Sequence, residues 1–260
     1  MGNGDPIDIE ELAAGYDEKR QMDPADFERL LGLIARQSEV GGRVLEVGCG
    51  TGFHLVPLAQ QLPETYFYGI EPADAMLAQA RVKARETGIS NCCLARADAH
   101  ALPFPEDTFD LILMSQVIHF FSDKTRAAAE VHRVSREGAS LIVITTSHSQ
   151  LRCQVDLSFF PGLIERELVR IPPVTEIKSL FEGLGFGLYN TTEFAATFSA
   201  PSADAMVEEV AGKPWSSYLL FTEVEFQRGL KDFRGNLRDV FGNGEITYLV
   251  PQTLLFFRRD

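Results

Sequence analysis

The chain has 260 residues, of which 45% are hydrophobic and 23% are charged, a composition that supports a packed core and excludes extensive intrinsic disorder. Its 24 basic and 37 acidic residues give a formal net charge of −13, so it lacks the basic surface with which proteins bind nucleic-acid phosphates. The longest mostly apolar stretch, residues 111–118, is far shorter than a membrane-spanning helix, and we expect neither nucleic acid nor a membrane among the partners.

The first predicted element is an amphipathic helix that begins after Asp23. This aspartate can cap the helix, and Pro24 suits its first turn. Phe27, Leu30 and Ile34 then recur at helical spacing and form one apolar stripe.

From residue 44 to residue 145, short apolar runs alternate with helical segments. The predicted strands are residues 44–47, 66–70, 91–95, 109–114 and 140–145, and the predicted helices are residues 53–61, 73–87 and 122–135. Strands that alternate with helices in this way indicate an α/β fold, in which a parallel sheet is covered by helices on both faces.

Past residue 150 this alternation ends. The sequence predicts a loop that contains residues 159–161 and 172–173, a helix over residues 175–183 and a strand over residues 186–194. Residues 202–241 are helical in character, and residues 245–258 read as a last strand interrupted by Pro251.

A glycine-rich turn follows the first apolar strand. Gly48, Gly50 and Gly52 alternate with other residues directly after residues 44–47, and glycines here let the backbone turn sharply and approach a ligand. Glu46, two residues before the first glycine, places a carboxylate at the mouth of the site, where a cationic ligand could compensate it.

Further acids follow the next two strands. Glu71 ends the strand of residues 66–70, about where an acid binds the ribose hydroxyls of an adenosine. Asp98, with Ala99 beside it, follows the third strand, and Ser115 and Gln116 follow the fourth. All of these residues belong at the carboxyl edge of the predicted sheet.

Together these motifs resemble those of the class I S-adenosylmethionine-dependent methyltransferases, and most closely the small-molecule "methyltransferase type 11" subgroup. The resemblance covers about residues 10–195 and rests on residues 44–52, Glu71, the Asp98-Ala99 pair and residues 102–110. It implies a Rossmann-like doubly wound, mostly parallel seven-stranded sheet with an antiparallel C-terminal strand. It also implies an N-terminal segment (1–40) that covers the cofactor site, a core (41–196 and 244–260) and a helical lid (197–243).

The resemblance assigns S-adenosylmethionine as cofactor and S-adenosylhomocysteine as its product. Glu46 and the glycine turn would hold the methionine part, Glu71 the ribose and Asp98 with the Ala99 amide the adenine. The expected cofactor-binding residues are Tyr16, Glu46, Gly48, Cys49, Gly50, Gly52, Glu71, Pro72, Asp98, Ala99, Ser115 and Gln116.

Three residues are candidates for catalysis. His119 falls where related enzymes often carry a histidine that faces the transferred methyl group, and it would be the general base if the nucleophile must lose a proton. Gln116 or Tyr16 would orient the acceptor. The alternatives are a structural role for His119, helix packing for Tyr16 and a turn cap for Asp98.

The predicted function is methyl transfer to a small organic acceptor by in-line displacement. Two alternatives remain at this point: a nicotinamide-dependent Rossmann oxidoreductase, against which the Gly48-x-Gly50-x-Gly52 spacing argues, and a protein that binds the cofactor without transferring its methyl group. We expect a monomer or a homodimer and no metal.

A basic strip lies in the lid beside an apolar helical stripe. It consists of Arg228, Lys231, Arg234 and Arg238. Together with Arg152 or Arg170, this strip suggests an anionic acceptor, whereas the alternative is an ordinary solvated face.

The cysteines indicate where the protein resides. The four of them, at positions 49, 92, 93 and 153, have no C-x-x-C spacing, which predicts free thiols in a reducing cytoplasm. Residues 1–6 also lack the basic and apolar segments of a secretory signal.

Overall fold

The apolar runs form one mixed seven-stranded sheet in the computed structural model, which describes residues 12–154, 159–242 and 244–260. The strands are β1 (Arg43–Val47), β2 (Tyr66–Ile70), β3 (Cys92–Ala95), β4 (Phe109–Ser115), β5 (Ser135–Thr145), β6 (Phe186–Ala200) and β7 (Ile246–Arg259). Their order is β3-β2-β1-β4-β5-β7-β6. β1 to β5 pair in parallel and β7 is antiparallel to both of its neighbours, which confirms the predicted fold class.

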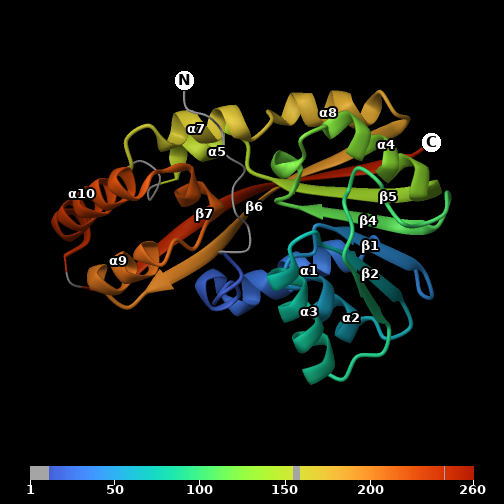
Figure 1. Cartoon of the computed structure of the whole chain (residues 1–260), viewed down its shortest axis with the longest axis horizontal. Coiled ribbons are helices and arrows are strands. Elements are labelled where there is room, and N and C mark those ends of the chain that lie inside the picture. The colour runs from blue at the N-terminus through green and yellow to red at the C-terminus, as the bar shows by residue number, and fades with distance from the viewer. Residues whose placement is uncertain (1–11, 155–158, 243) are drawn as a thin grey trace.

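Helices cover both faces of this sheet (Figure 1). They are α1 (Pro24–Ala35), α2 (Leu55–Gln61), α3 (Asp74–Glu86), α4 (Lys124–Val134) and α8 (Val174–Glu182). The first begins where predicted, because the Asp23 side chain accepts hydrogen bonds from the backbone N–H groups of Ala25 and Asp26.

Alternate strand residues build the two layers of the core. Leu45 and Val47 of β1 pack with α4 and α8, whereas Val44 packs with α1 and α2 on the opposite face. All three side chains are at most 2% exposed. Burial on both faces explains why the strands read as continuous apolar runs.

A second, smaller apolar core lies at the far end of β6 and β7 (Figure 1). It belongs to a group of helices that we call the cap: α5 (His148–Cys153), α7 (Leu163–Arg170), α9 (Ala203–Ala211), η4 (Ser216–Leu220) and α10 (Glu223–Phe241). The Phe160 ring stacks on Phe226 at 5.7 Å between centroids and lies 5.1 Å from the Tyr218 ring. Gly229 leaves room for Phe160, since a Cβ there would come within 2.3 Å of that ring.

The structure corrects three expectations for the C-terminal part. Residues Leu163–Arg170, predicted as loop, form α7, and β6 continues to Ala200 instead of ending at residue 194. β7 is not interrupted at Pro251, because β5 pairs with β7 only as far as Thr253. Beyond that point β6 is the one strand paired with β7 among the described residues, so the missing N–H of proline is tolerated as at a sheet edge.

No helix of the described residues is both long enough and apolar enough to cross a membrane.

Candidate functional site

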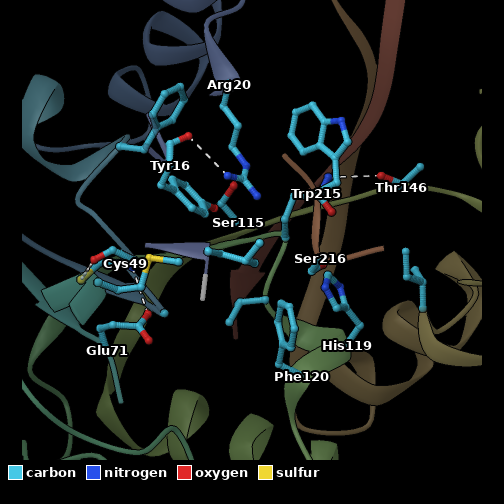
Figure 2. Close-up of a pocket in the computed structure, with 18 of the residues that line it drawn as sticks. Tyr16, Arg20, Cys49, Glu71, Ser115, His119, Phe120, Thr146, Trp215 and Ser216 are labelled. Carbon is cyan, nitrogen blue, oxygen red and sulfur yellow. Dashed lines mark hydrogen bonds between the residues drawn. The ribbon is translucent and has the colours of Figure 1, made fainter. Parts of the chain in front are cut away.

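A pocket of about 440 Å³ opens at the carboxyl ends of β1 and β4. The chain reverses its direction across the sheet here, since β2 lies on one side of β1 and β4 on the other, and ligands of open α/β sheets bind at such a point. The predicted site residues that line the pocket are Tyr16, Glu46, Gly48, Cys49, Gly50, Glu71, Pro72, Asp98, Ala99, Ser115, Gln116 and His119. Figure 2 shows Cys49 and Glu71 at one end, His119, Phe120 and Ser216 at the other, and Ser115 between them.

Gly52, the remaining residue predicted to bind the cofactor, is not among the residues that line the pocket. Its φ is +71°, and a Cβ would lie 3.0 Å from Val56 and 3.4 Å from Ala80. The missing side chain of Gly52 therefore allows α2 and α3 to approach closely.

The other two glycines shape the turn after β1. Gly48 and Gly50 have φ values of +72° and +53°, in the left-handed region that favours glycine. A Cβ on Gly48 would come within 2.4 Å of the Val117 side chain. The N–H groups of Gly48 and Cys49 both donate to the Ile70 carbonyl at 2.9 Å, which fixes the turn against the end of β2.

The Glu71 carboxylate is part of the same turn. Its Oε2 accepts from the Gly50 N–H and its Oε1 accepts from the Ala73 N–H, both at 3.0 Å. Although Glu71 is 6% exposed, it lines the pocket. Backbone hydrogen bonds thus orient the carboxylate before any ligand arrives.

Glu46 is more deeply buried, at 2% exposed. Its Oε1 lies 3.4 Å from His54 Nδ1, whereas its Oε2 is shielded from solvent and has no hydrogen-bond partner among the described residues. A buried carboxylate oxygen without a partner is costly, so this atom is suited to a donor supplied by a ligand.

Asp98 and Ala99 follow β3 as predicted. The Asp98 carboxylate accepts from the backbone N–H of His100 at 2.8 Å and contacts the His100 ring. The His100 backbone hydrogen bond, followed by the ring, holds the pKa of Asp98 below its usual range. Asp98 therefore caps a turn and also lines the pocket.

Sequence reasoning missed Arg20, which lines the pocket although it is only 9% exposed. Its guanidinium carbon lies 3.5 Å from the Tyr16 ring centroid and 5.0 Å from that of Trp215, and Nη1 donates to the Tyr16 carbonyl (Figure 2). Within the described ranges no carboxylate forms an ion pair with it, and burial lowers its pKa. In the sequence, the feature that could have pointed to Arg20 is its position four residues after Tyr16.

Gln116 and Thr146 join the ends of β4 and β5. Gln116 adopts φ +49°, its backbone N–H donates to the Ile144 carbonyl at 2.8 Å, and its Nε2 donates to Thr146 Oγ1 at 3.2 Å. A left-handed backbone at a residue other than glycine is strained and occurs often at functional sites. These bonds direct the Gln116 side chain along the pocket wall.

His119 lies in η3 (Ile118–Phe120), directly after this turn. Its Nδ1 is shielded from solvent and has no hydrogen-bond partner in the described part of the chain. Burial, with the positive charges of Arg170 and Lys124, holds the His119 pKa well below its usual range. The imidazole is therefore uncharged at neutral pH and its ring faces the pocket.

Three residues of the basic strip predicted from the sequence lie away from the pocket, and the side chain of the fourth, Arg238, is outside the described part of the structure. Arg228, Lys231 and Arg234 are exposed on α10 and do not line the pocket, and neither does the exposed Arg152. Of the cations named from the sequence, Arg170 is the one that does. The amphipathic pattern correctly identified which face of α10 is exposed to solvent, but it could not show whether that face lies near the pocket.

No group of three His, Cys, Asp or Glu side chains that could hold a metal ion occurs among the residues whose placement is described.

Comparisons with known proteins concern the family and the fold of the chain. A family model described as "Methyltransferase domain" matches residues 44–138. A phosphatidylethanolamine N-methyltransferase from Cereibacter sphaeroides is 30% identical over 191 residues, which cover 72% of this chain and 81% of that protein. A demethylmenaquinone methyltransferase from Geobacillus kaustophilus is 30% identical over 149 residues, which cover 55% of this chain and 63% of that protein, just under two thirds.

Among solved structures, the YcgJ protein from Bacillus subtilis superposes with a TM-score of 0.65 at 20% identity, covering 89% of this chain and 98% of that one. At this identity the likeness concerns the fold alone.

The turn after β1 allows a test on stability. We expect Gly48→Ala to lower the free energy of unfolding by about 1–2 kcal/mol for its left-handed backbone and by roughly 1–3 kcal/mol more for the displaced Val117 side chain. Gly88→Ala is the control, since Gly88 has φ +68° but nothing within 4 Å of a Cβ. Urea unfolding measures both variants, and equal losses would contradict this account.

The neutral state of His119 predicts a pH effect on stability. The pKa of His119 is lowered in the folded state, so below about pH 6.5 the histidine is protonated in the unfolded chain but not in the folded chain. The free energy of unfolding of the wild type therefore falls as the pH drops below about 6.5. His119→Gln removes this contribution. The free energy of unfolding of wild type minus that of the variant should decrease from pH 7.5 to pH 5, by up to about 1.4 kcal/mol per pH unit. A flat or rising difference would show that the histidine protonates freely in the folded state.

Proposed function

Because the chain belongs to the class I S-adenosylmethionine-dependent methyltransferases, we propose that its pocket holds the cofactor at the carboxyl ends of β1 and β2 and the acceptor between β4 and the cap. The protein is an enzyme that transfers a methyl group from S-adenosylmethionine to a small-molecule acceptor. Membership in this family excludes the alternative function, that of a nicotinamide-dependent oxidoreductase.

When bound, S-adenosylmethionine supplies a methyl group on a positively charged sulfur, which is a good electrophile. The protein's task is mainly to hold a nucleophile in line with this methyl group and to exclude water. Such alignment can account for about 7–11 kcal/mol of barrier reduction in well-oriented cases. This explains why the site needs no elaborate set of catalytic side chains.

Two buried charges carry the proposal for the methionine end of the cofactor. The Glu46 carboxylate has an oxygen without a partner, and Arg20 has no paired carboxylate among the described residues. A ligand with one ammonium group and one carboxylate compensates both, which is the charge pattern of an amino acid. Glu46 would therefore face the ammonium group and Arg20 the carboxylate.

The remaining cofactor residues have roles that follow from their positions. Glu71 would accept from the ribose hydroxyls, and Asp98 with the Ala99 N–H would bind the adenine. Gly48, Cys49, Gly50 and Pro72 line the same end of the pocket. The Cys49 thiol would contribute packing and not chemistry, because burial, with Glu46 and Glu71 nearby, raises its pKa well above the usual range.

His119, Gln116 and Tyr16 are proposed to act at the acceptor end. Because its Nδ1 has no hydrogen-bond partner among the described residues, neutral His119 can accept a hydrogen bond or a proton from the acceptor. Gln116, held by Thr146, would orient the acceptor beside Ser115. Tyr16, held beneath the Arg20 guanidinium, would cover the site.

The acceptor is not named by family membership. Relatives are described as acting on phosphatidylethanolamine and on demethylmenaquinone, so lipid-like and quinone-like acceptors are both proposals here. The exposed cations of α10 do not support the hypothesis of an anionic acceptor. Binding of such an acceptor would depend on Arg170. We further propose a cytoplasmic location, in keeping with the four free thiols, and a monomer or homodimer.

Binding of cofactor fragments tests the arrangement. We expect S-adenosylhomocysteine to bind wild type, and Arg20→Met and Glu46→Gln each to weaken it roughly 10- to 100-fold, the effect of losing a hydrogen bond to a charged group. 5′-Methylthioadenosine lacks the amino-acid part, so the same variants should leave its affinity unchanged. Glu71→Gln should weaken both ligands.

Isothermal titration calorimetry measures these affinities, with Arg29→Met as control because Arg29 is exposed on α1 and does not line the pocket. If Arg20→Met and Glu46→Gln weakened 5′-methylthioadenosine as strongly as S-adenosylhomocysteine, the proposed charge pairing would be wrong. Stabilisation by NADH instead of S-adenosylhomocysteine would overturn the proposed function itself.

A further inference from the structure

Two buried polar atoms at the cap side of the pocket have no hydrogen-bond partner among the described residues. One is Nη1 of Arg170 on α7, and the other is Nδ1 of His119 on η3. The Arg170 guanidinium carbon is 5.4 Å from the Phe120 ring centroid, and the His119 ring is 4.3 Å from it. Both residues therefore flank one aromatic ring, and both line the pocket.

A buried carboxylate fixes the direction of Arg170. Glu167, one turn earlier on α7, accepts from Arg170 Nε at 3.0 Å and from Nη2 at 2.9 Å. The two side chains are 1% and 12% exposed, respectively. This two-point contact uses one edge of the planar guanidinium and leaves Nη1 as a donor without an acceptor in the described part of the chain, at a cost that a ligand oxygen would remove.

The charge of the pocket indicates what kind of oxygen fits. Glu167 already compensates Arg170, so the pair carries no net charge. The other charged side chains that line the pocket are three carboxylates, Glu46, Glu71 and Asp98, and one guanidinium, Arg20. The bound cofactor would add one net positive charge, which leaves the lining slightly negative. An acceptor carboxylate would then be buried without a free counter-charge, which is unfavourable.

The rest of the pocket lining is largely apolar. Besides Phe120 it includes Phe121, Leu151, Ile171, Phe198 and Trp215, with Ser216 and Ser217 among its polar members. Figure 2 shows Phe120 and His119 across the pocket from Tyr16. The wall therefore suits a molecule that is mostly hydrocarbon or aromatic, with few polar atoms.

We propose that Arg170, held by Glu167, is a specificity-determining residue that donates a hydrogen bond from Nη1 to an uncharged carbonyl-type oxygen of a largely apolar acceptor lying against Phe120. His119 Nδ1 makes the second polar contact with the same molecule. This inference rests on the proposed function, since it places the acceptor beside a bound cofactor. It replaces the anionic acceptor suggested by the basic strip, and it disfavours an amine, which offers no acceptor to Nη1 when protonated.

Three probes of nearly equal shape test the charge preference on the wild-type protein saturated with S-adenosylhomocysteine. They are 4-phenylbutan-2-one, 3-phenylpropanoate and 4-phenylbutan-2-amine, which differ in carrying a ketone, a carboxylate and an ammonium group. Titrations followed by saturation-transfer NMR give their dissociation constants. We expect the ketone to bind at least tenfold more tightly than either charged probe.

A double variant tests the residue. Glu167→Leu with Arg170→Met replaces the buried ion pair by apolar side chains, a change that is often neutral for stability, whereas removal of one partner leaves an uncompensated charge. The ketone should lose roughly tenfold or more in affinity, as expected for a lost charge-assisted hydrogen bond. Arg166→Met is the matched control, because Arg166 lies on the same helix, pairs with Glu225 and does not line the pocket.

The outcomes separate the two levels of the argument. If S-adenosylhomocysteine does not bind wild type, the proposed function fails. Equal binding of S-adenosylhomocysteine to wild type and to the double variant would leave the proposed function intact. If the carboxylate or the amine then binds better than the ketone, the inference alone is overturned. The same holds if the double variant retains the ketone affinity. Should the double variant not fold by circular dichroism, the comparison of the three probes on wild type still decides the inference.

Discussion

The hydrogen bond between the Glu71 carboxylate and the Gly50 N–H is the contact on which the rest of the site depends. It closes a turn whose other N–H groups, those of Gly48 and Cys49, donate to the Ile70 carbonyl. The ends of β1 and β2 are thereby joined through a left-handed backbone that glycine adopts at little cost. These hydrogen bonds hold Glu46, on β1, and Glu71, directly after β2, beside each other at the pocket.

The polar groups of the pocket have two origins. At the cofactor end the carboxylates follow parallel strands, whose carboxyl ends meet at one edge of the sheet. The other charged groups come from outside the sheet: Arg20, also at the cofactor end, comes from the N-terminal segment, whereas Arg170 and Glu167, at the acceptor end, come from α7 in the cap. A buried charge without a partner is costly, so the pocket selects ligand groups by their charge as well as by their shape.

The position of the cap depends on the long antiparallel pair β6 and β7. These strands are paired from Phe186 with Arg259 to Ala200 with Ile246, so they continue well past the end of β5 and carry α9 and α10 beyond the sheet (Figure 1). Phe160, which precedes β6 in the sequence, packs with Tyr218 and Phe226, which follow it, in one aromatic core. This core holds α7 over the pocket, which brings Arg170 to Phe120.

The amino-acid sequence by itself determined the α/β sheet, the turn after β1 and the pocket positions of Glu46, Glu71 and Asp98, because each depends on local spacing and on the rule that parallel strands end at one edge. Tertiary structure alone decided the extent of the cap, the burial of Arg20, the pairing of Arg170 with Glu167 beside His119 and the distance of the α10 strip from the pocket. Helical periodicity identifies which face of a helix is apolar, but packing between segments far apart in the chain decides what that face meets.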